Sequence, residues 1–276
     1  MLEASPSNDS LLSARISVRY GDKPAVLREV ELNVCRGEVL GLIGQSGSGK
    51  STLAMALLGL LDRKHISIDG SIEFEGADLL KLRERELRDL RGRKIALVLQ
   101  SPLSSLNPAL KIRTQLKEAW RAHVTGTSVD CERAIRTALE SVSLPSSDEF
   151  LKKHPSQMSV GQAQRVLIAM AILHRPALLI ADEATSALDV ITQSEILALF
   201  RELNRNSGMS ILYISHDLAS VVGICDRISI LHQGQIVETG PTAQVLVHPQ
   251  HEYTQRLMAA MPKMPQATAG AKAASV

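Results

Sequence analysis

The chain has 276 residues, which is sufficient for one large α/β domain but too short for two complete catalytic domains. Hydrophobic residues make up 45% and charged residues 22%, a balance that excludes a largely disordered protein and predicts a well-filled core. Basic and acidic residues number 31 and 29, and aromatic residues are only 3%, so we do not expect a nucleic-acid partner.

The two ends of the chain differ in composition from the rest. Polar residues at 1–10 predict a disordered N-terminus, and an Ala-rich stretch predicts a flexible tail at 262–276, around one domain at 11–261. The cysteines Cys35, Cys131 and Cys225 lie far apart without metal-ligand spacing, which predicts reduced thiols and a cytosolic setting. No apolar run reaches the roughly 18 residues that span a bilayer, so we expect any membrane association to go through partner proteins.

The first third of the chain predicts strands and then a strand–loop–helix unit. Alternating apolar and polar residues at 12–20 and 26–34 predict two antiparallel strands joined by a turn. A short apolar strand at 38–43 then runs into a Gly- and Ser-rich loop and a helix from about Lys50 to Leu61. This order is the opening of a βαβ unit.

The middle of the chain, at about 102–165, is predicted to be mostly helical. Apolar residues at three-to-four spacing indicate helices at 114–124, 130–142 and 162–173. Short apolar runs predict strands at 95–99, 177–180 and 210–214, with a helix around 190–204 and a final hairpin of strands at 227–232 and 235–239. The alternation predicts a largely parallel sheet with helices on its faces.

The loop after the strand at 38–43 fits the phosphate-binding pattern G-x-x-x-x-G-K-[ST]. Its residues are Gly44, Gln45, Ser46, Gly47, Ser48, Gly49, Lys50 and Ser51, with Thr52 next. Glycines let backbone N–H groups turn toward a polyanion, and the following helix presents its positive end to the same point. We expect Lys50 to reach the β- and γ-phosphates of a nucleotide and the Ser51 hydroxyl to bind Mg²⁺. The plainer interpretation is an ordinary glycine-rich turn.

Two adjacent carboxylates, Asp182 and Glu183, follow the apolar strand predicted at 177–180. At the carboxyl end of a strand, one carboxylate can bind Mg²⁺ while the next accepts a proton from water. Two surface acids at a strand end are the alternative. Beside a phosphate loop, the pair favours a hydrolytic site with Asp182 at the metal and Glu183 as general base.

Further segments occur in the order shown by the ATPase subunits of ABC transporters, which the chain resembles over about residues 12–261. Residues 158–162 (MSVGQ) resemble the signature LSGGQ, and residues 186–189 (SALD) resemble the D-loop. Gln100 resembles the Q-loop glutamine, His216 the switch histidine, and Tyr20 the aromatic residue that stacks on adenine. Each of these could be an ordinary surface residue if it stood alone, but their joint order favours the family.

The resemblance implies the fold and the chemistry of the site. The expected fold is an α/β P-loop NTPase core with a RecA-like parallel sheet, an N-terminal antiparallel β subdomain and an inserted helical subdomain at about 102–165. The cofactors would be ATP and Mg²⁺. Gln100 would contact Mg²⁺ and the attacking water, and His216 would hold the γ-phosphate. Ser159, Gly161 and Gln162 would contact the ATP of an opposing ATPase subunit, either a second copy or a paralogue.

The resemblance also implies partners and a place in the cell. The chain would power integral-membrane permease subunits at the cytoplasmic face of the inner membrane, with a solute-binding protein acting indirectly. Residues 100–108 (QSPLSSLNP) and 248–254 (HPQHEYT) look like segments of dipeptide, oligopeptide and nickel importers. Members with a longer tail bind an iron–sulfur cluster, but no cysteine follows Cys225, so we expect no cluster.

Three alternatives differ in what they require of the sequence. A chromosome-structural or repair ATPase would need a long heptad coiled coil between Gln100 and Ser159, and the segment is too short for one. A translation-associated factor would carry two ATPase domains. An ATPase of a lipoprotein or drug exporter stays open, because ATP chemistry does not separate export from import, and the sequence does not name the transported solute.

The chain departs from the family pattern at Val160, Ala184 and Leu99, which replace the first signature glycine, a proline and an aromatic residue. If the signature loop requires a positive φ at Val160, a β-branched residue costs about 1–2 kcal/mol there. Otherwise the valine only adds bulk near the γ-phosphate. In either case we expect Ser159 to Gln162 to complete the slower half of an asymmetric pair, unless the substitution is neutral.

Overall fold

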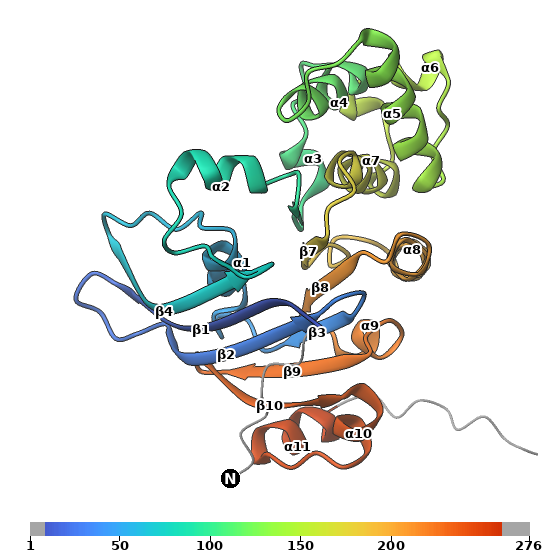
Figure 1. Cartoon of the computed structure of the whole chain (residues 1–276). Helices are drawn as coiled ribbons and strands as arrows, with labels where there is room; N and C mark the ends of the chain where they lie inside the picture. Colours follow the sequence, from blue (N-terminus) through green and yellow to red (C-terminus); the bar gives the residue numbers. More distant parts are fainter. Residues whose placement is uncertain (1–8, 261–276) are drawn as a thin grey trace, which may run out of the picture.

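The computed structural model describes residues 9–260, which form two sheets, a helical group above them and a pair of C-terminal helices below (Figure 1). The first sheet has the strand order β2-β1-β4-β5. Its strands are β1 (Ser10–Tyr20), β2 (Leu27–Cys35), β4 (Ile66–Phe74) and β5 (Ala77–Asp78). All its neighbouring strands are antiparallel, and β1 and β4 are the inner strands because each pairs with two neighbours.

The second sheet has the order β10-β9-β3-β8-β7-β6. Its strands are β3 (Val39–Ile43), β6 (Ile95–Val98), β7 (Leu178–Asp182), β8 (Ser210–Ser215), β9 (Arg227–His232) and β10 (Gln235–Pro241). The five strands from β9 to β6 run parallel, and β10 returns antiparallel to β9. The carboxyl ends of β3, β8, β7 and β6 therefore meet at one edge, where ligands bind in open α/β sheets.

The central strands β3, β7 and β8 are buried throughout and mostly apolar, because both faces of the sheet are covered. Leu40 and Leu42 of β3 face a core shared with the antiparallel sheet and α1 (Lys50–Leu57). Val39 and Ile43 face a second core, which extends to α8 (Val190–Ser207), α9 (Leu218–Val222) and the helical group. Because both faces of β3 are packed, the start of the loop that follows it is held in place.

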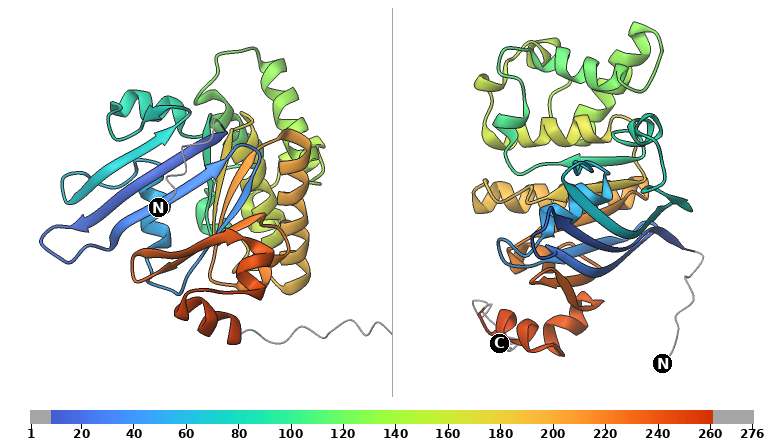
Figure 2. Two further views of the ribbon diagram at one scale, coloured as in Figure 1. Left: turned by 60° about the horizontal axis from the view of Figure 1, so that its bottom comes forward. Right: turned by 90° about the vertical axis from the view of Figure 1, so that its left-hand side faces the viewer.

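The helical group comprises α3 (Pro102–Ser105), α4 (Ile112–Arg121), α5 (Ser128–Ser141), α6 (Asp148–Leu151), the 3₁₀ turn η1 (Pro155–Gln157) and α7 (Val160–Ile172). Figures 1 and 2 show it on the side of the β7 and β6 end of the sheet, away from the C-terminal helices. Helix α7 packs on α3, α4, α5 and β6, so it joins this group to the parallel sheet. The remaining helices are α2 (Glu84–Leu90), α10 (Thr242–Val247) and α11 (Glu252–Ala259).

The structure confirms the predicted fold class and most predicted elements. The strands predicted at 12–20, 26–34, 38–43, 95–99, 177–180 and 210–214, the final hairpin, and the four helices at 114–124, 130–142, 162–173 and 190–204 are all present within a few residues. The helix predicted from Lys50 to Leu61 is too long, because it ends at Leu57 and Gly59 adopts a left-handed φ of 62°.

The predicted ends of the domain can be compared only in part. Strand β1 already includes Ser10, so the N-terminal limit at residue 10 falls inside a strand. The whole of the predicted tail at 262–276 lies outside the described part of the chain, as do residues 1–8 of the predicted disordered N-terminus. Within residues 9–260, no helix combines the length and apolar character that crossing a bilayer would demand.

Candidate active site

The phosphate loop connects the end of β3 to the start of α1, as the sequence predicts. Gly47 and Gly49 have φ values of 79° and 108°, a conformation that side chains disfavour. A Cβ on Gly44 would lie 2.4 Å from the backbone oxygen of Leu231, so the first loop position has no room for a side chain. The loop is thus built around glycine at each of these positions.

Lys50 is the first residue of α1, and its side chain is only 5% exposed. Its Nζ donates to the carbonyl oxygens of Gly44 at 2.8 Å and Gln45 at 3.1 Å, and lies 3.7 Å from Oε1 of Glu183. The buried ammonium therefore sits inside the loop, between backbone carbonyls and one carboxylate. A phosphate placed in the loop would meet this cation and the positive end of α1 together.

Asp182 ends β7 and is buried, with 7% of its surface exposed. Burial raises the pKa of its carboxyl, and a hydrogen bond with the Ser51 side chain opposes that rise. Its Oδ1 atom has no hydrogen-bond partner within the described residues. An unpaired buried carboxylate oxygen beside a hydroxyl fits a hard divalent cation such as Mg²⁺, whose other ligands would be phosphate oxygens and water. Asp182 and Ser51 therefore suit the metal that the sequence predicts for them.

Glu183 follows β7 with a φ of 49°, and its N–H donates to the carbonyl of Ile214 at 2.9 Å. A non-glycine residue in the left-handed region is uncommon and is held there by its surroundings. Its Oε1 lies 3.2 Å from Nδ1 of His216, which comes directly after β8. The structure thus brings together the predicted base, the predicted switch histidine and Lys50 at the carboxyl edge of the sheet.

Gln100 and Tyr20 are the predicted site residues with the least structural evidence. Gln100 is exposed and follows the edge strand β6, whose carboxyl end lies beside that of β7. Tyr20 is the last residue of β1 and is half-buried against the core shared by the two sheets. Among the described residues, no hydrogen bond joins either side chain to the phosphate loop. Their roles stay predictions.

The signature segment forms the start of α7 rather than part of the phosphate site. The Ser159 hydroxyl accepts from the N–H of Gln162 at 3.2 Å, and the Gln162 side chain accepts from the N–H of Ser159 at 3.3 Å, which is a capping box. A Cβ on Gly161 would lie 2.7 Å from Cγ2 of Thr192, so this glycine lets α7 approach α8 closely. In the part of the chain that the structure describes, no hydrogen bond connects these residues to Lys50.

Val160 is the first residue of α7 and is 38% exposed. It is not among the described non-glycine residues with positive φ. The expectation that this position could require a positive φ is therefore wrong for this chain, because a helical backbone accepts valine. The other alternative, that the valine adds bulk near the γ-phosphate, stays a prediction.

Sequence reasoning missed a support of the phosphate loop that comes from far along the chain. The N–H of Gly234, in the turn between β9 and β10, donates to the carbonyl of Ser48 at 3.1 Å. The only sequence signal was Gly234 as a hairpin turn, which does not reveal what the turn touches.

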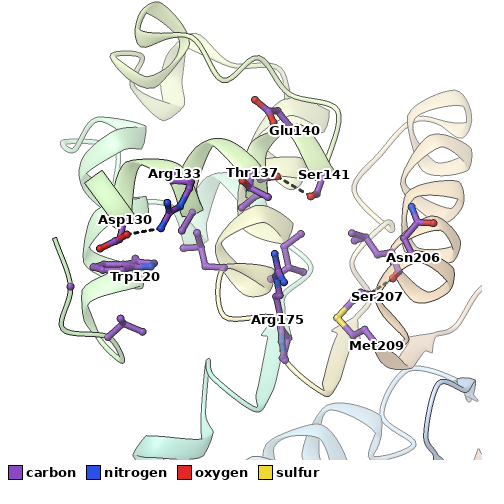
Figure 3. A pocket seen from close by; sticks show the side chains of 18 of the residues that line it. Trp120, Asp130, Arg133, Thr137, Glu140, Ser141, Arg175, Asn206, Ser207 and Met209 are labelled. Carbon is purple, nitrogen blue, oxygen red and sulfur yellow. Dashed lines mark hydrogen bonds and ion pairs between the residues drawn. The ribbon is translucent and has the colours of Figure 1, made fainter. Parts of the chain in front are cut away.

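A cavity of about 970 Å³ lies between the helical group and α8 (Figure 3). Trp120, Arg133, Arg175 and Met209 are among its lining residues. None of the predicted site residues lines it. The glycine-rich loop, Asp182, Glu183 and His216 instead lie at the strand ends described above.

Comparison with known proteins decides the family. The family model described as ABC transporter matches residues 27–186. This chain belongs to the ABC transporter family. As an ABC ATPase it has curated relatives that match over most of its length and over about three quarters of theirs. It is 41% identical over 251 residues to the dipeptide transport ATP-binding protein DppD of Haemophilus influenzae, covering 90% of this chain and 76% of that protein. It is 41% identical to the oligopeptide transport ATP-binding protein OppD of Salmonella typhimurium over 245 residues, covering 88% and 72%.

Solved structures agree on the fold of this ABC ATPase. The structure of cbiO1 from Clostridium perfringens, part of the ABC transporter complex cbiONQ, matches with a TM-score of 0.76 at 27% identity, covering 87% of this chain and 92% of that one. The dimeric post-hydrolysis state of the ATP-binding cassette MJ0796 bound to ADP and Pi matches with a TM-score of 0.72 at 26% identity, covering 84% and 98%. The chain is thus an ATPase subunit of this family.

Proposed function

We propose that this ABC ATPase hydrolyses MgATP to power an importer of peptides or a chemically similar small solute. The observation that carries the proposal is the 41% identity over 90% of the chain to a dipeptide transport ATP-binding protein. The segments at 100–108 and 248–254, which look like those of peptide and nickel importers, add support. No observation favours the export alternative.

Each residue at the strand ends has a proposed part in the reaction. Lys50 and the N–H groups of the loop bind the phosphates. Ser51 and Asp182 would hold Mg²⁺, which would neutralise phosphate charge. Glu183 accepts a proton from the attacking water, and His216 contacts the γ-phosphate. Phosphoryl transfer needs no covalent bond to the protein, so most of the catalysis comes from positioning the reactants and stabilising charge.

The site is completed by a second ATPase subunit, either another copy or a paralogue. Its signature segment lies over the nucleotide bound at Lys50, while Ser159, Gly161 and Gln162 of this chain lie over the partner's nucleotide. The exposed position of Ser159 at the N-terminus of α7 supports this arrangement, because the positive end of the helix dipole favours a negatively charged group there. Binding and release of ATP then close and open the pair, and the helical group passes that motion to permease subunits at the cytoplasmic face of the membrane.

The proposal is tested by reconstitution into vesicles. The chain is combined with candidate membrane subunits, a partner ATPase subunit and a peptide-binding protein, and uptake of a labelled dipeptide is measured with MgATP on the side of the ATPase. The proposal predicts uptake that requires ATP and the binding protein. Uptake of Ni²⁺ in place of dipeptide would change the solute only. Solute movement in the opposite direction, or none with active ATP turnover, would contradict import.

A further inference from the structure

The turn between β9 and β10 is wedged between the phosphate loop and the start of β2. A Cβ on Gly234 would lie 2.1 Å from the carbonyl oxygen of Val26, so the turn has no free space on that side. The N–H of Arg28 donates to the Gly234 carbonyl at 2.8 Å, and the Arg28 guanidinium donates to the Gln233 carbonyl at 2.6 Å. The N–H of Gly234 donates in the other direction, to Ser48. The turn therefore cannot move without disturbing the phosphate loop.

Helix α11 rests on the same hairpin from outside. The rings of His232 and Tyr253 stack with their centroids 3.7 Å apart and their planes at 19°. His232 is the last residue of β9, and Tyr253 lies in the first turn of α11 and is 6% exposed. Figures 1 and 2 show α10 and α11 beneath β10, at the opposite end of the molecule from the helical group.

A second anchor fixes the N-terminus of α11 on the hairpin. The carboxylate of Glu238, in β10, accepts from the N–H of Gln250 at 2.8 Å and from the N–H of His251 at 3.1 Å. The ring of His251 in turn accepts from the N–H of Tyr253 at 3.1 Å, which caps the helix. Both contacts orient the Tyr253 ring toward His232.

We propose that Tyr253 is a positioning residue for the phosphate loop, acting through its stack on His232 and through the Gly234 turn that this stack supports. The C-terminal helix then contributes to ATP affinity although it does not touch the nucleotide. The inference rests on nucleotide binding at the phosphate loop, as proposed above. It gives the segment at 248–254 a role in the fold that its sequence does not reveal.

The hydroxyl and the ring of Tyr253 have separable roles. Its Oη atom is buried and has no hydrogen-bond partner within the described residues. The ring makes the stack, so a phenylalanine retains the proposed contact and removes only an unpaired polar group. A leucine keeps a buried apolar side chain but cannot stack. The two substitutions therefore separate stacking from simple burial.

The test measures MgATP affinity of the purified full chain by titration, together with KM and kcat of the reconstituted transporter. Tyr253→Leu is expected to weaken ATP affinity and raise KM about three- to tenfold while kcat changes little, and Tyr253→Phe is expected to match the wild type. Leu257→Ala is the control, because Leu257 packs from the same helix against the core but takes no part in the stack. It is expected to lower thermal stability and leave affinity unchanged.

Hydrogen exchange adds a direct readout of the loop. The proposal predicts faster exchange of the amides at 44–52 in Tyr253→Leu and not in Leu257→Ala. Unchanged affinity in Tyr253→Leu, or an equal loss in Leu257→Ala, would overturn it. A wild-type chain that does not bind ATP would instead refute the proposed function, so the two failures are distinguishable.

Discussion

Glu183→Gln removes one negative charge from the site and preserves the shape of the side chain. Glutamine can adopt the same left-handed backbone, with φ of 49°, and keep the N–H bond to Ile214. The amide cannot accept the proton of the attacking water. General-base catalysis contributes about 10² to 10⁴ in rate, which corresponds to about 3–5 kcal/mol of barrier. We expect turnover to fall by that factor.

ATP binding is expected to persist in the same variant. The Glu183 carboxylate lies 3.7 Å from Nζ of Lys50, where the gross attraction between unit charges is about 4 kcal/mol at an effective dielectric constant of about 20. An incoming phosphate competes with this carboxylate for Lys50. Glutamine removes the competitor, while the carbonyls of Gly44 and Gln45 still hold the ammonium. Affinity should therefore be equal to or higher than that of the wild type.

The assay combines single-turnover hydrolysis by the assembled transporter with ATP titration and measurement of the molecular mass in solution. The variant should accumulate as an ATP-bound pair of ATPase subunits. Glu202→Gln is the control, because Glu202 is an exposed carboxylate on α8 away from the strand ends. Wild-type turnover in Glu183→Gln would refute the assignment of the base.

Three further predictions concern the signature segment and the histidines. Val160→Gly should cost less than the roughly 0.5–1 kcal/mol of a glycine in the middle of a helix, because Val160 is the first residue of α7. Turnover with a paralogous partner should rise several-fold if the valine slows the half-site that it completes, whereas an unchanged rate in every pairing would make the valine neutral. Gly161→Ala places a Cβ 2.7 Å from Cγ2 of Thr192 and should destabilise the chain by about 1–3 kcal/mol. Thr192→Ser deletes that methyl group, so adding it to Gly161→Ala should recover most of the lost stability in thermal melts. No recovery would exclude this contact as the cause. Burial and the nearby His174 and Arg93 lower the pKa of His123, and Asp89 partly opposes that shift. Burial and the nearby His251 and Arg256 lower the pKa of His232. The folded state thus favours the neutral rings, so their contribution to stability is complete above the ordinary histidine pKa of about 6.5 and is lost as the pH falls below it. A double variant, His123→Asn with His232→Asn, should therefore lose less stability on acidification than the wild type. An equal loss in the two proteins would contradict this.

The local sequence pattern was sufficient to predict the phosphate loop and the two carboxylates, because each is a short segment whose chemistry depends on residues adjacent in sequence. Gly49 and Lys50 show this, since the glycine turn and the helix start coincide. Parallel topology then explains why Glu183 and His216, at the ends of β7 and β8, lie together. The sequence of a single strand does not determine its neighbours in the sheet. The contact between Glu183 and His216 was therefore predicted from the family resemblance and not from their spacing.

Other features depend on contacts that the sequence hides. Strand β4 was missed because its half-exposed alternation is interrupted by Gly70, and it becomes a strand by pairing with β1. That glycine is required, since a Cβ there would lie 1.9 Å from the Arg15 carbonyl. The bond from Gly234 to Ser48 joins segments far apart in the chain, and only the folded structure reveals it.

The most direct test of nucleotide binding at the phosphate loop is to compare MgATP binding by the purified wild-type chain and by Lys50→Ala. Lys50 serves the loop and the ligand at the start of α1, so its loss should affect binding far more than folding. We expect one MgATP bound by the wild type, no measurable binding by Lys50→Ala, and similar circular dichroism for the two proteins. A folded Lys50→Ala chain that binds MgATP as tightly as the wild type would contradict it.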